Sequence, residues 1–160
     1  MKTALFVARF QPLHKGHLHV MKSLMKKYIL VIVIGSTNKK NNDNPLSFSV
    51  RKKMINLSLK TYKCKYRIIG IKDLHDDMKW SKSIEKKAKF DFVVTGNRKG
   101  NSEEWVKRCF PDKRVIRYPM FYPRKYKATK IRKLIKERKK WQHLVPEECV
   151  KIIKREIRTR

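Results

Sequence analysis

The sequence predicts an α/β protein with a Rossmann-like, doubly wound parallel sheet. Short apolar runs alternate along the chain with segments whose apolar residues recur at helical spacing. Strands that alternate with helices in this way form βαβ units and a parallel sheet. One run, Ile29–Ile34 (ILVIVI), is apolar throughout and rich in β-branched residues, as a strand buried on both faces requires. Ligands bind beyond the carboxyl ends of such strands, so we expect the site in the loops that follow them.

The expected elements follow one another without a repeat or a linker. Predicted strands cover residues 3–8, 29–34, 66–71, 90–95 and 115–118, the last with the character of an edge strand. Predicted helices cover residues 17–27, then 48–61 behind a cap at Ser47 or Ser49, then 79–87 and 102–109. Thr129 is expected to cap a helix through Ile131, and the last helix to begin near Pro146. In the helix over 48–61, Val50, Met54 and Leu57 are expected to face inward.

The length of 160 residues fits one domain with a real core. We expect an α/β core over residues 1–125 and a helical extension over residues 126–160. The three cysteines, Cys64, Cys109 and Cys149, are far apart and form no CxxC pair, which fits reduced thiols in a cytosolic protein. No stretch approaches the ~20 apolar residues of a membrane span, and the N-terminus lacks a signal-peptide core. A cytoplasmic protein is expected.

The charge balance is strongly basic. Forty-three Lys and Arg face 13 Asp and Glu, a net charge of +30, and the basic residues are spread from Lys2 to Arg160. Such a charge attracts polyanions: nucleic acid, an anionic membrane or phosphorylated small molecules. It is also consistent with a lysine-rich surface that reflects composition alone, and both interpretations stay open.

A candidate phosphate site follows the first predicted strand. The string RFQPLHKGH, residues 9–17, leaves that strand and opens a helix. His14 and His17 are three apart, and Gly16 between them has no Cβ to block a close approach. Free backbone N–H groups and the helix dipole favour an anion at the start of this helix, where the two imidazoles can donate to phosphate oxygens. The alternatives are a pair of histidines that only cap and pack the helix, and a zinc pair, for which no third ligand cluster stands nearby.

This string resembles the HxGH motif of the nucleotidyltransferase superfamily of adenylyl- and cytidylyltransferases. The longer form RFQPxHxGH is similar to archaeal-type nicotinamide mononucleotide adenylyltransferases. KATKIR, residues 127–132, resembles the superfamily's second signature SxTxIR, with Lys127 in place of the first serine. Further resemblances cover most of the chain in order: the stretch from Asn44-Pro45 to Arg51, HDDMKWS at 75–81, TGN at 95–97, PMF at 119–121 and LVP at 144–146.

The resemblance implies a single nucleotidyltransferase domain that joins ATP to nicotinamide mononucleotide, giving NAD and pyrophosphate with Mg²⁺ carried by the phosphates. It implies catalytic roles for His14, His17 and Arg132. The implied nucleotide-binding residues are Arg9, Phe10, Gln11, Gly16, Gly96, Asn97 and Thr129. The implied acceptor-binding residues are Arg51, Asp77, Arg124 and Trp80, the last as a stacking platform for nicotinamide. It also implies a homo-oligomer.

Asp77 departs from the family, which commonly has Asn three residues before this Trp, and a carboxylate accepts hydrogen bonds where an amide also donates. Other phosphomonoester acceptors therefore stay open: phosphopantetheine, flavin mononucleotide, or an alcohol phosphate with CTP. The alternative outside the enzymes is a non-catalytic nucleic-acid-binding protein with the same fold. The net charge of +30 favours this alternative.

Overall fold

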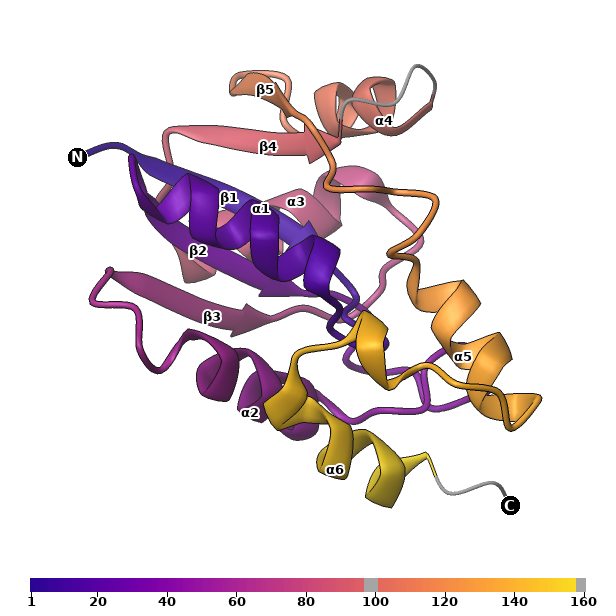
Figure 1. Ribbon diagram of the computed structural model, residues 1–160. Coiled ribbons are helices and arrows are strands. Elements are labelled where there is room, and N and C mark those ends of the chain that lie inside the picture. The colour runs from indigo at the N-terminus through magenta and orange to yellow at the C-terminus, as the bar shows by residue number, and fades with distance from the viewer. Residues whose placement is uncertain (97–100, 158–160) are drawn as a thin grey trace.

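The computed structural model describes residues 1–96 and 101–157, without the side chains of residues 101 and 102. Its centre is one parallel sheet in the order β3-β2-β1-β4-β5 (Figure 1). The strands are β1 (Thr3–Ala8), β2 (Ile29–Ile34), β3 (Tyr66–Gly70), β4 (Phe92–Gly96) and β5 (Arg114–Tyr118). The predicted fold class is confirmed, and each strand falls within two residues of its predicted bounds.

The strand order fixes where a ligand can sit. The chain runs outward from β1 through β2 to β3, then crosses back so that β4 pairs with the other side of β1. The order therefore reverses between β1 and β4, and a crevice opens beyond the carboxyl ends of strands at such a switch point. The loop after β1 and the end of β4 at Gly96 flank that crevice.

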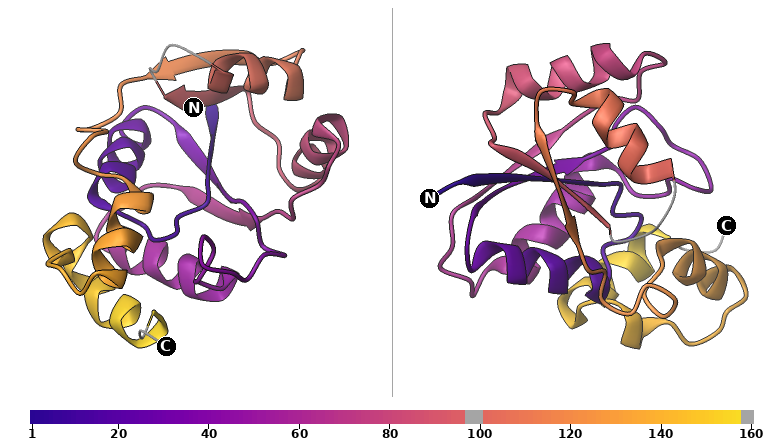
Figure 2. Two further views of the ribbon diagram at one scale, coloured as in Figure 1. Left: turned by 90° about the vertical axis from the view of Figure 1, so that its right-hand side faces the viewer. Right: turned by 90° about the horizontal axis from the view of Figure 1, so that it is seen from above.

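Helices cover both faces of the sheet (Figures 1 and 2). On one face lie α1 (Lys15–Met25), α2 (Phe48–Leu59), α5 (Ala128–Lys136), the 3-10 turn η1 (Gln142–Leu144) and α6 (Glu147–Glu156). On the other lie α3 (Asp77–Lys87) and α4 (Asn101–Cys109). Each face has its own hydrophobic cluster, the first built around Phe6, Ile32 and Met54 and the second around Leu5, Val33 and Phe110.

The C-terminal segment contributes to the first of these clusters. Ile131 of α5, Leu144 of η1 and Ile153 of α6 belong to the same buried cluster as strands β1 and β2. Cys149 of α6 lies 3.4 Å from the hydroxyl of Ser58 in α2. These contacts support our proposal that the chain folds as one domain, including the expected extension over residues 126–160. Among the residues the structure describes, no helix is both long and apolar enough to cross a membrane.

Several helix ends differ from the sequence predictions. Helix α2 begins after Ser47, whose hydroxyl accepts from the Val50 N–H at 3.3 Å, so Ser47 and not Ser49 is the cap. Leu57 of the same helix is 37% exposed, so its predicted inward orientation is wrong. The buried stripe of α2 instead runs through Arg51, Met54, Ile55, Ser58 and Leu59, because α6 and the sheet cover the helix from that side.

Helix α5 begins at Ala128, two residues earlier than a cap at Thr129 would allow. Its N-cap position is Lys127, which makes no side-chain cap hydrogen bond, and Thr129 is the second helical residue. The prediction that Thr129 caps this helix is therefore wrong. Pro146 likewise takes the N-cap position of α6 and not its first turn.

Candidate active site

The loop from β1 into α1 is held in an unusual conformation. Phe10 has a φ of 53°, in the left-handed region that residues with a side chain seldom adopt. Its ring is buried and packs edge-on against His17, with centroids 4.9 Å apart. Such strain persists only where the surroundings determine it, and it gathers at functional sites.

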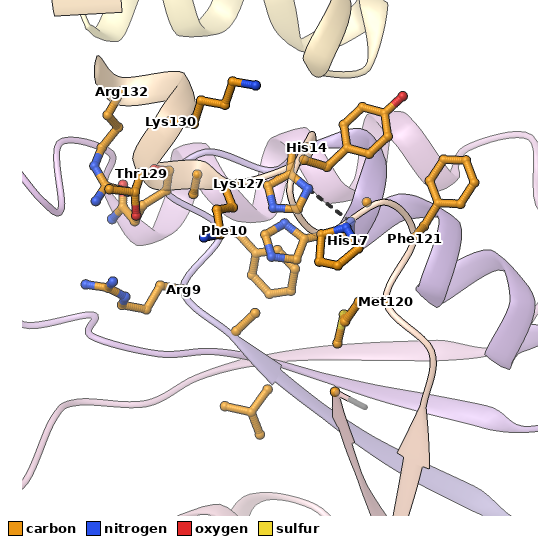
Figure 3. A pocket seen from close by; sticks show the side chains of 18 of the residues that line it. Arg9, Phe10, His14, His17, Met120, Phe121, Lys127, Thr129, Lys130 and Arg132 are labelled. Atoms are coloured by element: carbon orange, nitrogen blue, oxygen red, sulfur yellow. Dashed lines mark hydrogen bonds between the residues drawn. The ribbon is translucent and has the colours of Figure 1, made fainter. Parts of the chain in front are cut away.

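His14 is the N-cap of α1. Its Nδ1 accepts a hydrogen bond from the backbone N–H of His17 at 3.2 Å (dashed line in Figure 3). Because Nδ1 is an acceptor, the proton of the neutral ring is on Nε2, which leaves Nε2–H as a donor. The rings of His14 and His17 are stacked with centroids 3.6 Å apart. The sequence alternatives of capping and phosphate binding therefore do not exclude each other, since the cap uses one nitrogen only.

Burial keeps both imidazoles neutral near pH 7. Burial lowers the pKa of His14 to about 4. Burial, and then the proximity of His14, hold the pKa of His17 well below its usual value. The Nδ1 atom of His17 is buried and has no hydrogen-bond partner among the described residues. Neutral imidazoles remain hydrogen-bond donors and add no further repulsion to this basic site.

Gly16 is required by close packing of the chain itself. A Cβ at Gly16 would lie 2.9 Å from the Cβ of Tyr126 and 3.0 Å from the His14 ring. The close neighbours of Gly16 are therefore the His14 ring and Tyr126, which lies in the connection between β5 and α5.

Aromatic side chains link this connection to α1. Tyr126 stacks on Phe121 with centroids 5.5 Å apart, and Phe121 stacks on the ring of His19 at 3.9 Å. The ring of Tyr126 is also parallel to that of His14, at 6.5 Å. We call Tyr126, Phe121 and His19 the aromatic brace. It fixes the connection, and hence the start of α5, against the helix that carries both histidines.

The start of α5 supplies the opposite wall of the site. Arg132 donates from Nη1 to the carbonyl of Gln11 at 2.8 Å, and its Nη2 lies 3.4 Å from the carboxylate of Asp43. Burial lowers the pKa of Arg132, an effect opposed by Asp43. Because Lys127 places no side chain on the first-turn amides of α5, these N–H groups and the helix dipole are available to an anion.

These elements enclose a cleft of about 760 Å³ (Figure 3). In the figure, Arg132 and Thr129 project from α5 on one side, and Met120 and Phe121 close the other. The cleft lies at the switch point between β1 and β4. Its lining includes every predicted catalytic residue and all but one of the predicted nucleotide-binding residues: Arg9, Phe10, Gln11, His14, Gly16, His17, Gly96, Thr129 and Arg132. The exception, Asn97, lies outside the residues that the structure describes.

Gln11 lines the cleft with its backbone, while its side chain is engaged elsewhere. The side-chain amide donates to the carbonyl of Leu46 and accepts from the N–H of Leu46, both at 2.9 Å. This pair of bonds clips the loop after β1 to the start of α2. The side-chain amide of Gln11 is therefore occupied by Leu46, and its backbone carbonyl accepts from Arg132.

The structure places Arg51 in the interior of the chain. Its side chain is fully buried, and it donates from Nη1 to the carbonyls of Arg9 and Gly35 at 2.7 Å. It also donates to the carbonyls of Ser47 at 3.2 Å and Ser36 at 3.4 Å. Burial lowers the pKa of Arg51 to about 10. Arg51 thus joins the ends of β1 and β2 to α2, and these carbonyls occupy most of the donors that were expected to face the acceptor phosphate.

Trp80 and Asp77 face the other side of the sheet. Trp80 is buried in the second hydrophobic cluster, where its ring centroid lies 5.0 Å from that of Trp105 in α4. Asp77 accepts from the indole N–H of Trp105 at 3.2 Å and lies 3.8 Å from the guanidinium of Arg108. Both residues therefore contact α4 and do not reach the cleft. The ring of Trp80, expected as a stacking platform, packs between α3 and α4 instead. Arg124 is exposed and also lies outside the cleft lining.

Several residues of the site were not singled out from the sequence. Lys130 and Lys133 of α5, Met120 and Tyr126 line the cleft. Met120 lies 3.1 Å from where a Cβ of Gly96 would stand. The lysines could have been found from their helical spacing around Arg132. Met120 and Tyr126 gave no such signal, because only the path of the connection brings them to β4 and α1.

Among the described residues that line the cleft, none carries a carboxylate. Within residues 1–96 and 101–157, no three His, Cys, Asp or Glu side chains form a group that could hold a metal ion. The electrostatics of the site are cationic, with Arg9, Lys127, Lys130, Arg132 and Lys133 around two neutral histidines. Fold and site together define an α/β protein with a cationic cleft at the switch point of its sheet, a site suited to an anionic ligand.

Comparison with known proteins gives the same class. A model of the cytidylyltransferase-like family matches residues 5–144, and the chain belongs to this family. A nicotinamide-nucleotide adenylyltransferase of Methanococcus maripaludis strain C5 is 36% identical over 155 residues, which span 94% of this chain and 87% of the relative. One from Sulfurisphaera tokodaii is 37% identical over 163 residues, 94% of this chain and 90% of the relative.

A solved structure is similar across most of the fold. The bifunctional NMN adenylyltransferase/ADP ribose pyrophosphatase of Francisella tularensis superposes with a TM-score of 0.77 at 27% identity. The match covers 91% of this chain and 45% of that protein, so this chain spans less than half of the bifunctional enzyme.

Proposed function

We propose that this protein is a nicotinamide-nucleotide adenylyltransferase, which transfers the adenylyl group of ATP to nicotinamide mononucleotide. The observation that carries the proposal is the convergence of His14, His17, Arg132 and the first turn of α5 on one cationic cleft at the switch point of the sheet. The class of enzyme agrees with the names of the relatives at 36–37% identity.

In the reaction, a phosphate oxygen of nicotinamide mononucleotide attacks the α-phosphorus of ATP. The new P–O bond forms as the bond between the α-phosphorus and the bridging oxygen to the β-phosphate breaks, and pyrophosphate carries that electron pair away. Such a transfer needs positioning and charge stabilisation more than covalent help. His14 donates to the triphosphate from Nε2–H and His17 from its ring N–H, while Arg132, Thr129 and the amides of α5 hold the departing pyrophosphate.

We propose Mg²⁺ as the metal that accompanies ATP. The cleft offers no carboxylate, which fits an ion held by phosphates and water, as Mg²⁺ often is. When bound, the ion neutralises part of the charge that develops on the phosphates. Arg9 and the three lysines of the cleft act on the same charge from the protein side.

The choice of acceptor rests on the names of the relatives. In this structure Trp80 and Asp77 contact α4, so they do not by themselves support a nicotinamide site. The test is to incubate the protein with Mg²⁺ and either ATP or CTP, adding each acceptor in turn, and to follow pyrophosphate and NAD. The acceptors are nicotinamide mononucleotide, phosphopantetheine, flavin mononucleotide and an alcohol phosphate.

We expect pyrophosphate and NAD with ATP and nicotinamide mononucleotide, and little product with CTP. Pyrophosphate release with a different acceptor would keep the class of enzyme and overturn the substrate. An Arg132→Met variant serves as the control for contaminating activity, since it removes the guanidinium from the proposed pyrophosphate site. No pyrophosphate from any combination would contradict the proposed function.

We also infer a homo-oligomer, as the family resemblance implies. A net charge of +30 on each chain opposes large assemblies, because like charges repel across the interfaces. A light-scattering mass in moderate salt tests this inference, and the mass of a single chain would contradict it.

A further inference from the structure

One edge of the molecule carries uncompensated positive charge. Between residues 44 and 72 the chain has eight Lys and Arg and no Asp or Glu. Arg51 is buried, and the others are exposed on α2, on the connection to β3, on β3 and just after it. We call six of them the β3 edge surface: Lys52, Lys53, Lys60, Lys63, Lys65 and Arg67.

The fold brings these cations together. β3 is an edge strand that pairs only with β2. The hydroxyl of Tyr66 in β3 donates to the side chain of Asn56 in α2 at 3.0 Å. Lys65 and Arg67 flank that tyrosine, while Lys53 and Lys60 lie on either side of Asn56 along the exposed face of α2. Tyr66 packs on the hydrophobic cluster of the α2 face, and Arg67 pairs in register with Val31 of the opposite cluster, so the side chains of Lys65 and Arg67 leave the edge strand on the face opposite α2. The cations therefore border one edge of the sheet from both faces, and Figure 1 shows α2 beside β3.

No acidic side chain neutralises this surface. None of its six cations has an ion-pair partner among residues 1–96 and 101–157. Elsewhere the pattern differs, since Glu103 pairs with Lys107 and Arg117, and Asp73 pairs with Lys39. Uncompensated charge costs stability through repulsion, and a polyanion would relieve it.

Shape and chemistry of this surface favour the phosphate backbone of a nucleic acid. A shallow hollow lies on α2 between Lys52, Lys53 and Lys60. The nearby tyrosines offer no free ring for base stacking: Lys22 covers the ring of Tyr62 at 4.5 Å, and Tyr66 is half-buried. An anionic membrane would need an apolar face to insert, and only Leu57, 37% exposed, is a large exposed apolar residue here.

We propose that the β3 edge surface binds nucleic acid through its phosphates, without reading its sequence. This role is independent of adenylyl transfer, because no residue of the surface lines the active-site cleft. Binding of this kind releases counter-ions, so its logarithmic salt slope is about −0.7 for each phosphate contacted on a single strand and about −0.9 on a duplex. Both forms should bind, and base composition should matter little.

The test compares two variants with the same change of net charge. The first, Lys60→Glu/Lys65→Glu/Arg67→Glu, reverses three cations of the β3 edge surface. The control, Arg114→Glu/Lys136→Glu/Lys140→Glu, reverses one arginine on the opposite edge strand and two exposed lysines at the end of α5 and after it. None of these control cations has an ion-pair partner among the described residues. A third variant, Lys60→Arg/Lys65→Arg/Arg67→Lys, keeps the charge.

Affinity for a labelled RNA strand of mixed sequence and for a DNA duplex is measured by anisotropy over a series of KCl concentrations. We expect the first variant to bind at least tenfold more weakly, with a salt slope smaller by roughly 2 to 3, and the charge-keeping variant to bind like the wild type. Thermal unfolding checks that each variant is folded, so the result does not depend on enzyme activity.

Two outcomes would overturn the proposal. Equal losses in the first variant and the control would mean that net charge alone attracts the nucleic acid. Binding to vesicles of phosphatidylserine and phosphatidylcholine, without binding to RNA or DNA, would identify a membrane surface instead.

Discussion

At the scale of single residues, His14 combines two roles on one ring. Its Nδ1 caps α1 by accepting from His17, and its Nε2–H is left for a phosphate oxygen. The two roles use different nitrogens, so substitutions can separate them. Arg51 differs from His14, because its guanidinium donates to four backbone carbonyls and few of its N–H groups remain free for a ligand.

Replacing His14 by Asn and by Ala should separate capping from catalysis. Asn is a good N-cap and Ala is a poor one, so His14→Asn should unfold with a free energy about 1 kcal/mol higher than His14→Ala. Both lose the Nε2–H donor, so kcat should fall by about 10²–10³-fold in each. Urea unfolding and a pyrophosphate assay measure the two effects. Wild-type kcat in His14→Asn would show that the imidazole only caps the helix.

Arg51→Lys should weaken the fold. A lysine cannot reach four carbonyls as a planar fork does, and buried carbonyls are left without partners. We expect a loss of roughly 2–5 kcal/mol in the free energy of unfolding. The exposed neighbour Lys52, changed to Arg, is the matched control and should unfold like the wild type. Wild-type stability of Arg51→Lys together with a raised KM for the acceptor would contradict this prediction and support the acceptor contact expected from the sequence.

The buried histidines make stability depend on pH. The pKa of His14 is about 4 in the folded chain and 6.5 in the unfolded chain, so between these values the unfolded state binds more protons. Stability is therefore complete above pH 6.5 and decreases as the pH falls towards 4, by roughly 3 kcal/mol for His14. Urea unfolding over this range should give a shallower decrease in His14→Asn than in the wild type. Equal slopes would contradict the lowered pKa.

At the scale of elements, the site depends on how α5 is positioned against α1. Thr129 and Arg132 lie on α5, and both histidines lie at the start of α1. The aromatic brace of Tyr126, Phe121 and His19 joins the two, together with the bond from Arg132 to the Gln11 carbonyl. The tight contact of Tyr126 with Gly16 leaves no room for a shift of this connection.

Tyr126→Leu should disturb catalysis without touching the reacting atoms. Leucine keeps the Cβ that packs on Gly16 and removes the ring that stacks on Phe121 and lies parallel to His14. We expect kcat to fall about tenfold, because misplaced groups are costly in a reaction that relies on positioning. No hydrogen bond of the Tyr126 hydroxyl is found among the described residues, so Tyr126→Phe should keep the wild-type kcat. Steady-state kinetics test the pair, and loss of kcat in both variants would assign a role to the hydroxyl instead of the ring.

At the scale of the whole molecule, charge dominates. The net charge of +30 is not balanced by ion pairs, and several cations gather around the active-site cleft and on the β3 edge surface. In the proposed function the first location holds a polyphosphate substrate, and we propose a nucleic acid for the second. Both assignments have the same physical basis: positively charged side chains that lie close together repel one another, and a bound anion reduces that repulsion.

Salt should therefore stabilise the folded chain. Screening of self-repulsion is expected to raise Tm by roughly 3–6 °C, or about 1–2 kcal/mol, between low and moderate NaCl. Circular dichroism melts over a salt series measure this. Pyrophosphate at matched ionic strength should raise Tm further, because it binds the folded cleft. A Tm that falls with salt would contradict this account.

Much of the fold and of the nucleotide site could be predicted from residues alone. The alternation of strands and helices predicted the parallel sheet. Strands and helices could be told apart because their apolar residues recur with different periods. The string from Arg9 to His17 and the segment from Thr129 to Arg132 marked two walls of the cleft, which lie at strand and helix ends where ligands bind. Local chemistry was sufficient at these points, since the start of a helix presents free backbone N–H groups and the positive end of the helix dipole.

The acceptor residues could not be predicted in the same way. Arg51 can contact a ligand only if neighbouring segments leave its guanidinium donors free. Trp80 can do so only if they leave its indole ring uncovered. Strand β2 and the loop after β1 use the guanidinium of Arg51, and α4 covers Trp80 and Asp77. The two short bonds of Arg51 join it to residues 42 and 16 positions away along the chain. The bond between Trp105 and Asp77 spans 28 positions. No local sequence pattern predicts such distant partners.

The sequence by itself determined the fold class, the position of the phosphate cleft and the excess of positive charge, because each depends on periodicity, local geometry or composition. Only the tertiary structure decided that Arg51 is a buried clamp, that Tyr126 contacts Gly16 closely, and that the cations of α2 and β3 border the same edge of the sheet. These features depend on contacts between distant segments, and such contacts exist only once the sheet has brought the segments together.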